Sequence, residues 1–554
     1  MNTKTEISKI CVDCKKEFVI DLGDLILYKK IGLKIPEQCF FCRFKQYSAF
    51  WVFGKFRKGI SDLSGENLIT VLPNNARYPI YKSHEWWGDG WDPMNFGQDY
   101  DSSRFFFDQL KELQEKIPRP HQTGENSTGC DWCDDVWDSK NCYLSRSLSK
   151  CENLNYSYRI VESKDSSDLV FCFNLQNSYD CLACHNSFNL NFSENSKDCI
   201  DSNFLFDCRN CQNCFMSYNL RNKQYCIRNK QYNKEEYERE FKNIKLDSYK
   251  NVQILKDEIK NMVKNEAVHR ENFNLKTTNS VGNYLTNCDK CVNCFTWEHS
   301  QNCRNLVRGI DTKDCIDQLG TWHVEVSGAN SCAYGGYQLK NSSWSNARYS
   351  EYLDLCDDVE YCFGCVGLRK KKYCIFNKQY SKEEYEKLQN KIIKDMESRG
   401  EYGKFLPYSM GLSGYNLSNG FIYFPDTTKD EIIKKNGYWS EEDMSSTDGI
   451  SSLELPDSIS DTKSDISSQA LICPESKYRF NISQAEYEFH KNKNFALPRL
   501  HFDLRMIKKT NKIRVLRSYL YKCIYCKNDI MAYYPPEWGY KKIACEECYK
   551  QNIA

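Results

Sequence analysis

Cysteine recurs through the middle of this chain at spacings of 9 or 12 residues. Nine residues separate Cys142 from Cys151 and Cys199 from Cys208, and twelve separate Cys130 from Cys142. Short apolar stretches lie between them, broken by Asn, Asp and Ser and without helical periodicity. Short strands separated by polar corners, at about 18–24 residues per full turn, predict a parallel β-solenoid whose coils stack their inward residues.

A second kind of repetition shows that this middle region is modular. The segment LRNKQYCIRNKQYNKEEYEREF, residues 220–241, matches LRKKKYCIFNKQYSKEEYEKLQ, residues 368–389, at an offset of 148. Each copy ends a run of coils and then enters a helix. Ser381 and Glu384 have the spacing of a capping box, which the earlier copy imitates. The duplication predicts two solenoid parts, each followed by a helix.

The chain has 31 cysteines and only eight histidines among its 554 residues. Its first residues, MNTKTEISKICVDC, contain no apolar run fit for a signal peptide, and no stretch approaches a membrane span. We therefore expect a cytoplasmic protein without membrane association, in which so many cysteines do not form a disulfide framework. Metal binding or thiol-lined cores must explain them, and the scarcity of histidine points to all-cysteine zinc sites.

The clustered cysteines of the middle region favour packing over metal binding. Two runs of the form C-x2-C-x2-C, beginning at Cys208 and Cys288, resemble part of a ferredoxin motif but lack the Cys-Pro step that should follow. At the offset of 148, Cys211 meets Val359. A position that accepts Val for Cys behaves as a small interior site. A ladder of thiols inside the solenoid is the favoured interpretation, with further zinc or an iron–sulfur cluster as alternatives.

Two sets of paired CxxC motifs lie near the two ends of the chain. They consist of Cys11, Cys14, Cys39 and Cys42, and of Cys523, Cys526, Cys545 and Cys548. Each CxxC forms a tight knuckle that presents two thiolates, and two knuckles complete a tetrahedron around Zn²⁺. Redox pairs would need a thioredoxin-like βαβ context, which the sequence lacks. We expect two zinc ribbons holding two structural Zn²⁺ ions, because four protein ligands leave no open position for catalysis.

A third segment looks like a ribbon that has lost its metal. Residues 472–505, ICPESKYRFNISQAEYEFHKNKNFALPRLHFDLR, align without a gap with residues 10–43. Only the first cysteine survives, and the four ligand positions hold Cys473, Ser476, His501 and Leu504. Structural zinc is worth about 10–16 kcal/mol in small ribbons, so this one must gain stability elsewhere. We interpret residues 471–505 as a metal-free ribbon that packs onto the C-terminal ribbon or the solenoid.

The stretch YKSHEWWGDGWDPMNFGQDYDSSRFFFDQLKEL, residues 81–113, combines aromatic and acidic residues most densely. Aspartates beside tryptophans could hold a sugar or a divalent cation, but we favour an aromatic plug over the open edge of the first solenoid coil. If the protein has a small-molecule site, the candidate residues are Trp87, Asp89, Trp91, Asp92, Asp99, Asp101 and Arg104. The sequence contains no Walker A, dinucleotide-binding, HExxH or GxSxG motif.

The last part of the chain alternates between polar and basic segments. Residues 426–468 are rich in Ser, Asp, Thr and Lys, which predicts a solvated linker. Residues 505–522 carry seven basic residues and no acidic one: Arg505, Lys508, Lys509, Lys512, Arg514, Arg517 and Lys522. Such a strip beside a ribbon could contact phosphates, although a solvated helix face is the more ordinary interpretation. The formal net charge of +1 excludes a globally basic nucleic-acid binder.

The N-terminal stretch CVDCKKEFVIDLGDLILYKKIGLKIPEQCFFCR resembles the family called probable zinc-ribbon domain. The wider arrangement resembles cysteine-rich zinc-ribbon proteins of candidate-phyla bacteria, through WWGDGWDP, FGCVGLRKKKYCIFNKQYSKEEYE, FALPRLHFDLR and CIYCKNDIMAYYPPEWGYKKIACEECY. The resemblance covers most of the chain. It implies zinc ribbons at the two four-cysteine sets and implies no particular chemistry.

We expect a mainly β fold, a parallel β-solenoid with a cysteine-lined core, interrupted by helices and flanked by zinc ribbons. The predicted order is an N-terminal zinc ribbon (1–50), an aromatic and acidic capping segment (51–125), a first solenoid part (126–232), a helical insertion (233–280), a second solenoid part (281–380), a helix (381–400), an irregular segment and polar linker (401–470), the metal-free ribbon (471–505) and a C-terminal zinc ribbon (506–554).

This organisation favours a non-enzymatic, zinc-binding scaffold that serves as an interaction platform for a protein partner. The alternative is nucleic-acid or ribosome-associated binding through the C-terminal ribbon and the basic strip. A weaker alternative is a carbohydrate-active β-helix enzyme that uses the aspartates of the aromatic and acidic segment. The sequence leaves the partner and the oligomeric state open.

Overall fold

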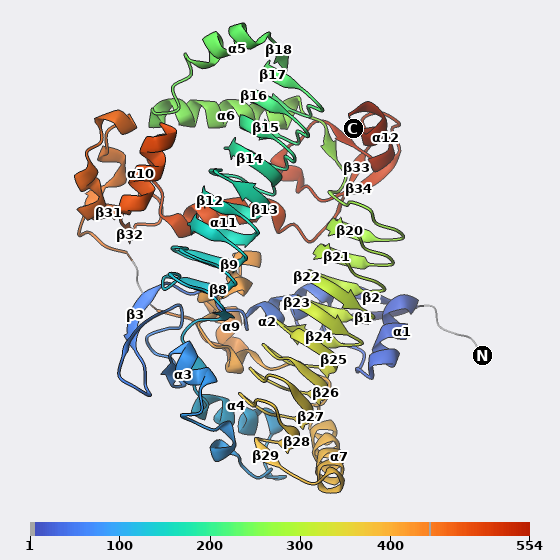
Figure 1. Ribbon diagram of the computed structural model, residues 1–554. Coiled ribbons are helices and arrows are strands. Elements are labelled where there is room, and N and C mark those ends of the chain that lie inside the picture. The colour runs from blue at the N-terminus through green and yellow to red at the C-terminus, as the bar shows by residue number, and fades with distance from the viewer. Residues whose placement is uncertain (1–5, 442–444, 554) are drawn as a thin grey trace. The chain divides into compact units, whose positions relative to one another are not determined.

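The computed structural model describes residues 6–441 and 445–553 and confirms a mainly β chain built on parallel β-solenoid coils (Figure 1). The chain forms two compact units, and each joins two separate stretches of sequence. The first unit consists of Met1–Gln122 with Asn272–Ser440, and the second of Thr123–Glu271 with Glu441–Ala554. The first unit therefore combines one solenoid part with the N-terminal ribbon, and the second combines the other solenoid part with the two ribbons of the C-terminal stretch.

The first unit contains β1 (Glu6–Ile10), β2 (Glu17–Asp21), α1 (Leu22–Ile31), α2 (Phe40–Ser48), β3 (Arg57–Ile60), β4 (Asn67–Thr70), β5 (Ile80–Tyr81), α3 (Ser83–Trp87), α4 (Phe106–Lys116) and β6 (Arg119–Pro120). Its solenoid strands are β20 (Val281–Thr286), β21 (Val292–Glu298), β22 (Arg304–Lys313), β23 (Ile316–Glu325), β24 (Gly328–Ser331), β25 (Tyr334–Lys340), β26 (Ala347–Glu351), β27 (Val359–Phe363), β28 (Lys372–Ile375) and β29 (Lys378–Gln379). They are followed by α7 (Lys382–Ser398), α8 (Asn419–Tyr423) and α9 (Lys429–Lys434).

The second unit contains the solenoid strands β7 (Gly124–Glu125), β8 (Cys133–Trp137), β9 (Ser145–Ser149), β10 (Glu152–Asn155), β11 (Tyr158–Val161), β12 (Lys164–Ser167), β13 (Val170–Gln176), β14 (His185–Asn191), β15 (Ile200–Phe206), β16 (Gln212–Tyr218), β17 (Gln224–Ile227) and β18 (Lys230–Gln231). Next come α5 (Lys234–Phe241), α6 (Tyr249–Asn265) and β19 (His269–Arg270). The C-terminal stretch adds β30 (Ile450–Ser451), β31 (Leu471–Ile472), β32 (Arg479–Phe480), α10 (Gln484–Lys493), α11 (Phe502–Ile513), β33 (Tyr519–Lys522), β34 (Asp529–Ala532), β35 (Ile543–Ala544) and α12 (Glu546–Asn552).

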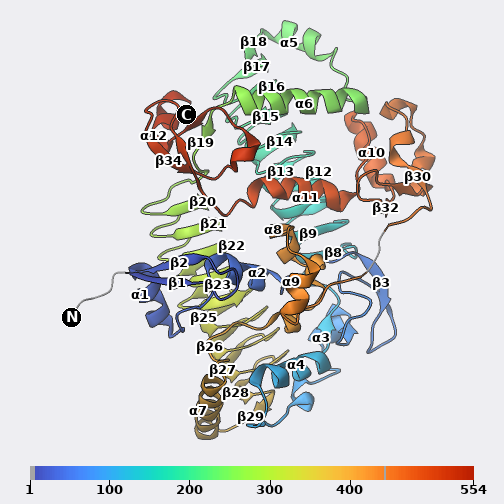
Figure 2. The same cartoon turned by 180° about the vertical axis from the view of Figure 1, so that it is seen from behind.

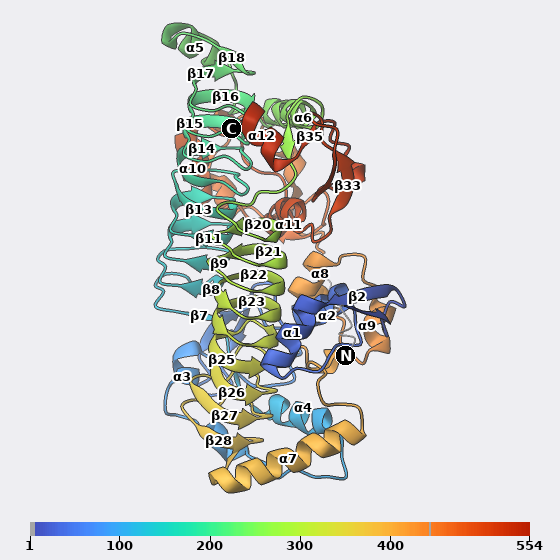
Figure 3. The same ribbon diagram turned by 90° about the vertical axis from the view of Figure 1, so that its right-hand side faces the viewer.

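One coil of the solenoid has twelve residues, so the expected 18–24 residues per turn was wrong. Paired residues in neighbouring coils are twelve apart, as in Cys214 with Cys226 and Cys362 with Cys374. Figure 3 shows the strands of each solenoid part stacked in sequence order. Every third residue from Asp135 to Arg228 has a positive φ, which divides each coil into four short sides. Asn and Asp recur at these corners because they tolerate the left-handed region better than most residues.

The residue after each corner points into the solenoid, and these interior positions are filled by Cys, Ser and aliphatic side chains. Every third residue from Cys130 to Ser217 is buried. A thiol and a hydroxyl make the same contact there: Cys172 Sγ donates to Val170 O at 3.3 Å, and Ser178 Oγ donates to Gln176 O at 3.0 Å. This equivalence confirms a cysteine-lined core and explains why Cys alternates with Ser inside it.

Both solenoid parts end in the same way, as the duplicated segment predicts. The last strands turn back as antiparallel hairpins, β17 with β18 and β28 with β29. The helices α5 and α7 then begin at the predicted capping boxes, which are formed by Asn233 with Glu236 and by Ser381 with Glu384. An antiparallel hairpin followed by a helix blocks the exposed strand edge on which further coils could otherwise pair.

The aromatic segment covers the last coils of the second solenoid part, not the first coil of the first part as we predicted. Phe106 is fully buried, and its ring contacts the rings of Tyr352, Phe363 and Phe376. The guanidinium group of Arg369 lies over two tryptophans of the segment. Proximity in sequence suggested the first coil, whereas the aromatic rings that contact Phe106 lie more than 200 residues later in the chain.

The predicted polar linker is not solvated throughout. Residues 445–470 are described and include three short 3₁₀ helices. Their apolar side chains Leu455, Ile459 and Ile466 are buried in one core with Leu471 and Phe480 of the metal-free ribbon. The apolar positions were spaced too irregularly among serines and aspartates to stand out as a packing pattern. They supply core for residues 471–505, in which three of the four ligand positions hold no cysteine.

Candidate metal centres

The first knuckle of the N-terminal ribbon lies at the turn between β1 and β2. Cys11 N donates to Lys16 O at 2.9 Å, and Lys15 N donates to Cys11 O at 3.0 Å. Lys15 adopts a φ of 60°, which turns the chain back after Cys14. This conformation brings both thiols of the CxxC motif to one side of the turn, as a chelating knuckle requires.

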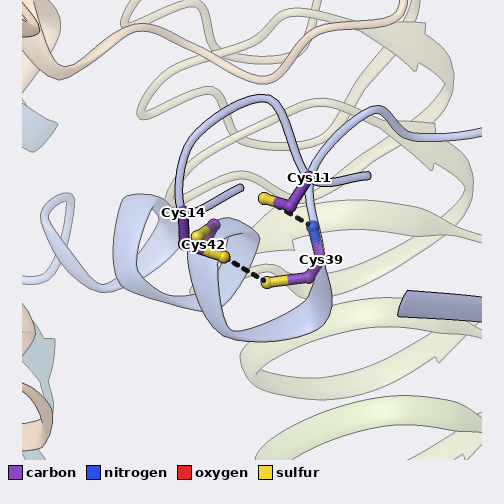
Figure 4. Close-up of side chains that lie close together, drawn as sticks. All are labelled: Cys11, Cys14, Cys39 and Cys42. Carbon is purple, nitrogen blue, oxygen red and sulfur yellow. Dashed lines mark hydrogen bonds between the residues drawn. The ribbon is translucent and has the colours of Figure 1, made fainter. Parts of the chain in front are cut away.

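The second knuckle is built by the start of helix α2. Cys39 is the N-cap of α2, and its backbone N–H donates to Cys11 Sγ at 3.3 Å. Figure 4 shows Cys11, Cys14, Cys39 and Cys42 converging. The four sulfur atoms lie within 4.8 Å of one another, and Cys14 Sγ and Cys39 Sγ are 3.7 Å apart. A tetrahedron with Zn–S bonds of about 2.3 Å has an edge of about 3.8 Å, so this cluster has the size of a ZnS₄ centre.

Helix α2 also favours the thiolate form that a metal needs. Hydrogen bonding from the Cys42 side chain, together with the Cys42 backbone N–H, lowers the pKa of Cys39 to about 5 even though burial opposes this. A helix N-terminus stabilises negative charge through its unpaired N–H groups and its dipole. Metal ligands of this type bind as thiolates, so part of the cost of deprotonation is already met by the fold.

The C-terminal centre repeats this construction between the β33–β34 hairpin and α12. Cys545 is the N-cap of α12, and its N–H donates to Cys523 Sγ at 3.4 Å. Cys545 Sγ lies 3.7 Å from Cys523 Sγ and 3.9 Å from Cys526 Sγ. Against the effect of burial, the backbone N–H groups of Cys545 and Cys526 lower the pKa of Cys523 to about 6.

The two clusters are therefore the two sets that the sequence predicted, and their residues fit a structural Zn²⁺. Among residues 6–441 and 445–553 they are the only groups whose metal-ligating atoms lie this close together. A bound Zn²⁺ would cross-link a β-hairpin turn to a helix start in each ribbon. All four positions around each ion would be occupied by protein ligands, which is typical of structural rather than catalytic zinc.

The metal-free ribbon keeps the backbone of the knuckle that has lost its ligands. Cys473 N donates to Tyr478 O at 2.9 Å, and Lys477 N donates to Cys473 O at 3.1 Å, with a φ of 60° at Lys477. Its helix α10 begins at Ser483, the counterpart of Asp21 at the start of α1, and both residues cap their helix. The knuckle backbone and the helix cap are therefore the same in residues 471–505 as in the N-terminal ribbon, and the absence of metal from this module stays a prediction.

The N-terminal ribbon and the metal-free ribbon each dock onto a solenoid part through a buried arginine and aspartate. In the first unit, Arg43 of α2 pairs with Asp317 at 2.7 Å, and the two side chains are 8% and 3% exposed. Figure 2 shows α2 beside the coils of β23 and β24. In the second unit, Arg505 of α11 pairs with Asp168, and their side chains are 9% and 1% exposed. Glu486 also accepts a hydrogen bond from Arg505, at 3.1 Å.

These two ion pairs occupy equivalent positions of the internal duplication. The ribbons are offset by 462 residues, and 43 plus 462 gives 505. The two solenoid parts are offset by 149 residues, and 168 plus 149 gives 317. This offset holds up to one shorter coil, in which Gly336 pairs with Ala347, eleven residues later instead of twelve. Each unit therefore contains a ribbon docked on the same coil of a solenoid part, and the docking pair is present whether or not the ribbon has its four cysteines.

The basic strip is largely neutralised inside the second unit. Besides Arg505, Lys509 pairs with Asp180 at 2.5 Å and Lys508 with Glu475 at 2.6 Å. Lys512 pairs with Glu194, and Lys522 pairs with Asp529 at 2.9 Å. Helix α11 thus presents much of its charge to carboxylates of the solenoid and the ribbon. Of the seven predicted residues, only Arg514 and Arg517 lie outside these acidic pairs, and each has its own contacts in the structure.

The predicted ligand residues of the aromatic segment do not converge on one site. Asp92 accepts a hydrogen bond from Met94 N at 2.9 Å, Asp99 pairs with Lys378 at 2.6 Å, and Asp101 accepts from Ser103 N at 2.8 Å. Arg104 pairs with Glu112, and Trp91 Nε1 donates a hydrogen bond to Trp86 O at 2.8 Å. Trp87 is 45% exposed, and the carboxylates of Asp89 and Asp92 both interact with the charge of Arg369. This arrangement is that of a packed cover.

We expect the double substitution Asp89→Asn with Asp92→Asn to leave the fold and the binding of a partner unchanged. An amide in place of the Asp92 carboxylate still offers a side-chain oxygen to cap the 3₁₀ helix Pro93–Phe96, so the free energy of unfolding should fall by no more than about 1 kcal/mol. Thermal melts together with partner capture test this. Loss of binding in a variant that melts normally would identify the segment as a ligand site.

Two features of the structure could have been found from sequence and were missed. The triplet period of the solenoid is visible from residue 130 onward as Cys, Ser or Leu at every third position, usually after Asn or Asp. The docking arginine is visible as the identity of Arg43 and Arg505 in the ribbon alignment. Its aspartate partner carries no such signal, because Asp168 and Asp317 look like every other Asx corner.

None of the helices in the described residues is long and apolar enough to cross a membrane. Comparison of the chain with protein-family models and with curated proteins finds no match. The resemblance to zinc-ribbon proteins of candidate-phyla bacteria therefore stays a prediction, and function must be argued from the geometry alone.

Proposed function

We propose that this protein is a non-enzymatic, zinc-binding scaffold that presents solenoid and ribbon surfaces to a protein partner. The observation that carries the proposal is the size of the two four-cysteine clusters. The sulfur atoms of Cys14 and Cys39 lie 3.7 Å apart, and those of Cys523 and Cys526 lie 3.7 and 3.9 Å from that of Cys545. Zinc in such closed sites stabilises a fold and leaves no coordination position for a substrate. The ions would make the ribbons rigid, and the buried pair of Arg43 with Asp317 holds the N-terminal ribbon on its solenoid part, as a platform requires.

The nucleic-acid alternative receives less support from the structure. A phosphate-binding strip needs cations that are free to meet the backbone of a nucleic acid, and counterion release scales with their number. Five of the seven residues in the strip are paired with carboxylates of the second unit. RNA or DNA would have to compete with these carboxylates for the same cations.

A carbohydrate-active enzyme is supported least. Hydrolysis of a glycosidic bond usually needs two carboxyl groups that face one another across the substrate. The aspartates of the aromatic segment cap a 3₁₀ helix, pair with Lys378 or accept backbone hydrogen bonds. We also propose a cytoplasmic location, because 31 unpaired cysteines suit a reducing compartment.

Metal analysis of the purified protein tests the central claim. We expect close to two zinc ions per chain and negligible iron, because the thiols inside the solenoid donate to backbone carbonyls and do not converge in fours. Inductively coupled plasma mass spectrometry with an absorption spectrum is sufficient. Iron–sulfur absorption, or four or more zinc ions released only on unfolding, would show that the interior cysteines are ligands.

A further inference from the structure

One outer corner of the second solenoid part stacks three metal-ligating side chains in a column. Glu298 pairs with Ile310, and Ile310 pairs with Trp322, in the parallel strands β21, β22 and β23. The corner residues that follow these three are His299, Asp311 and His323, whose φ values are 49°, 52° and 56°. They therefore hold the same position in three successive coils.

The geometry of the column suits one small cation. Neighbouring strands of a sheet lie about 4.7–4.9 Å apart, so Asp311 stands between the two histidines, one coil from each. His323 Nδ1 and Asp311 Oδ2 are already 3.3 Å apart, and their side chains are 64% and 45% exposed. Exposed side chains can rotate at little cost, so the three groups can close on an ion without moving the backbone.

The composition of the column is unusual for this chain. Two of its eight histidines occupy this one column, with a carboxylate between them. At the offset of 149, the corresponding residues of the first solenoid part are Lys150, Glu162 and Asn174. Lys150 and Glu162 form an ordinary ion pair there, at 3.6 Å. Two imidazoles thus replace lysine and asparagine, while the carboxylate between them is kept, on an equivalent scaffold in which a simple ion pair is sufficient.

A further carboxylate lies beside the column. Glu298 directly precedes His299 in the chain, at the end of strand β21. Two imidazoles with one or two carboxylates are a donor set that suits Zn²⁺ and Ni²⁺.

We propose that His299, Asp311 and His323 form a third metal site, which binds a divalent transition-metal ion at the surface of the second solenoid part. This site is independent of the two four-cysteine centres and differs from them in being open. Three protein ligands leave coordination positions for water or for a ligand from a partner molecule. The ion would cross-link three coils from outside.

The test uses full-length protein with both four-cysteine centres loaded with zinc, titrated with Ni²⁺ in a calorimeter. We expect one additional Ni²⁺ per chain, and a loss of affinity of about tenfold or more in His299→Ala, His323→Ala and Asp311→Asn. His84→Ala, which removes an exposed histidine in helix α3, is the matched control and should bind as the parent does.

Thermal melts in buffer without Ni²⁺ establish that the variants are folded, as expected for exposed corner residues. No binding of Ni²⁺ to the parent protein would overturn the proposal. Binding that survives in the His299→Ala/His323→Ala double variant would also overturn it, because the ion would then be held elsewhere.

Discussion

Removal of zinc is expected to unfold the N-terminal ribbon while the metal-free ribbon stays folded and docked. Structural zinc contributes an apparent 10–16 kcal/mol or so in modules of this size, more than a ribbon of about 40 residues can replace by burying apolar surface. Residues 471–505 escape this dependence because Leu455, Ile459 and Ile466 extend their core. The two modules have the same backbone conformation, but we expect metal to stabilise the first and a larger apolar core to stabilise the second.

Hydrogen exchange with mass spectrometry, before and after a strong chelator, measures this directly. Amides of α1 and α2 should lose protection by several orders of magnitude, and amides of α10 and α11 should change little. Cys11→Ser should reproduce the effect of the chelator on the first ribbon. Cys473→Ser is the matched control and should cost no more than about 1 kcal/mol. Equal loss of protection in both ribbons would contradict the assignment of residues 471–505 as metal-free.

Substitution of Arg43 by Met is expected to destabilise the docked N-terminal ribbon by about 3–5 kcal/mol. The variant leaves the Asp317 carboxylate 3% exposed without its cation, and an uncompensated buried charge is costly. Arg43 also donates to Gln38 O, which directly precedes the ligand position Cys39, so we expect a smaller loss of zinc affinity beside the larger loss of docking. Local hydrogen exchange of α2 and zinc content measure the two effects separately.

The double variant Arg43→Met with Asp317→Leu should recover much of this loss, since the pair is then replaced by apolar groups. Arg505→Met tests the equivalent pair of the second unit. It should cost a comparable amount, because Glu486 loses its cation while Asp168 keeps only Lys509, at 3.8 Å. If Arg43→Met changed the protection of α2 by less than about 1 kcal/mol, the ion pair would not be what fixes the ribbon on its coil.

The sequence by itself determined the local chemistry of this protein. The eight candidate metal ligands, the knuckle shared by three ribbons, the capping boxes of α5 and α7 and the cysteine-lined solenoid were all readable, because each depends on residues close together in the chain. A CxxC turn needs only four residues to present two thiols, and a capping box also needs only four. The same locality explains why the loss of three ligands from residues 471–505 could be recognised without a structure.

Only the tertiary structure decided which module meets which. The coil length was misjudged because a spacing of nine, three sides of a four-sided coil, was as frequent as the full turn of twelve. The basic strip looked free because its acidic partners Asp168, Asp180 and Glu194 lie more than 300 residues away and resemble ordinary corner residues. The position of the aromatic segment on Tyr352 and Phe363 was missed for the same reason. Burial and charge pairing depend on contacts between residues that are distant in sequence, and spacing along the chain does not reveal these contacts.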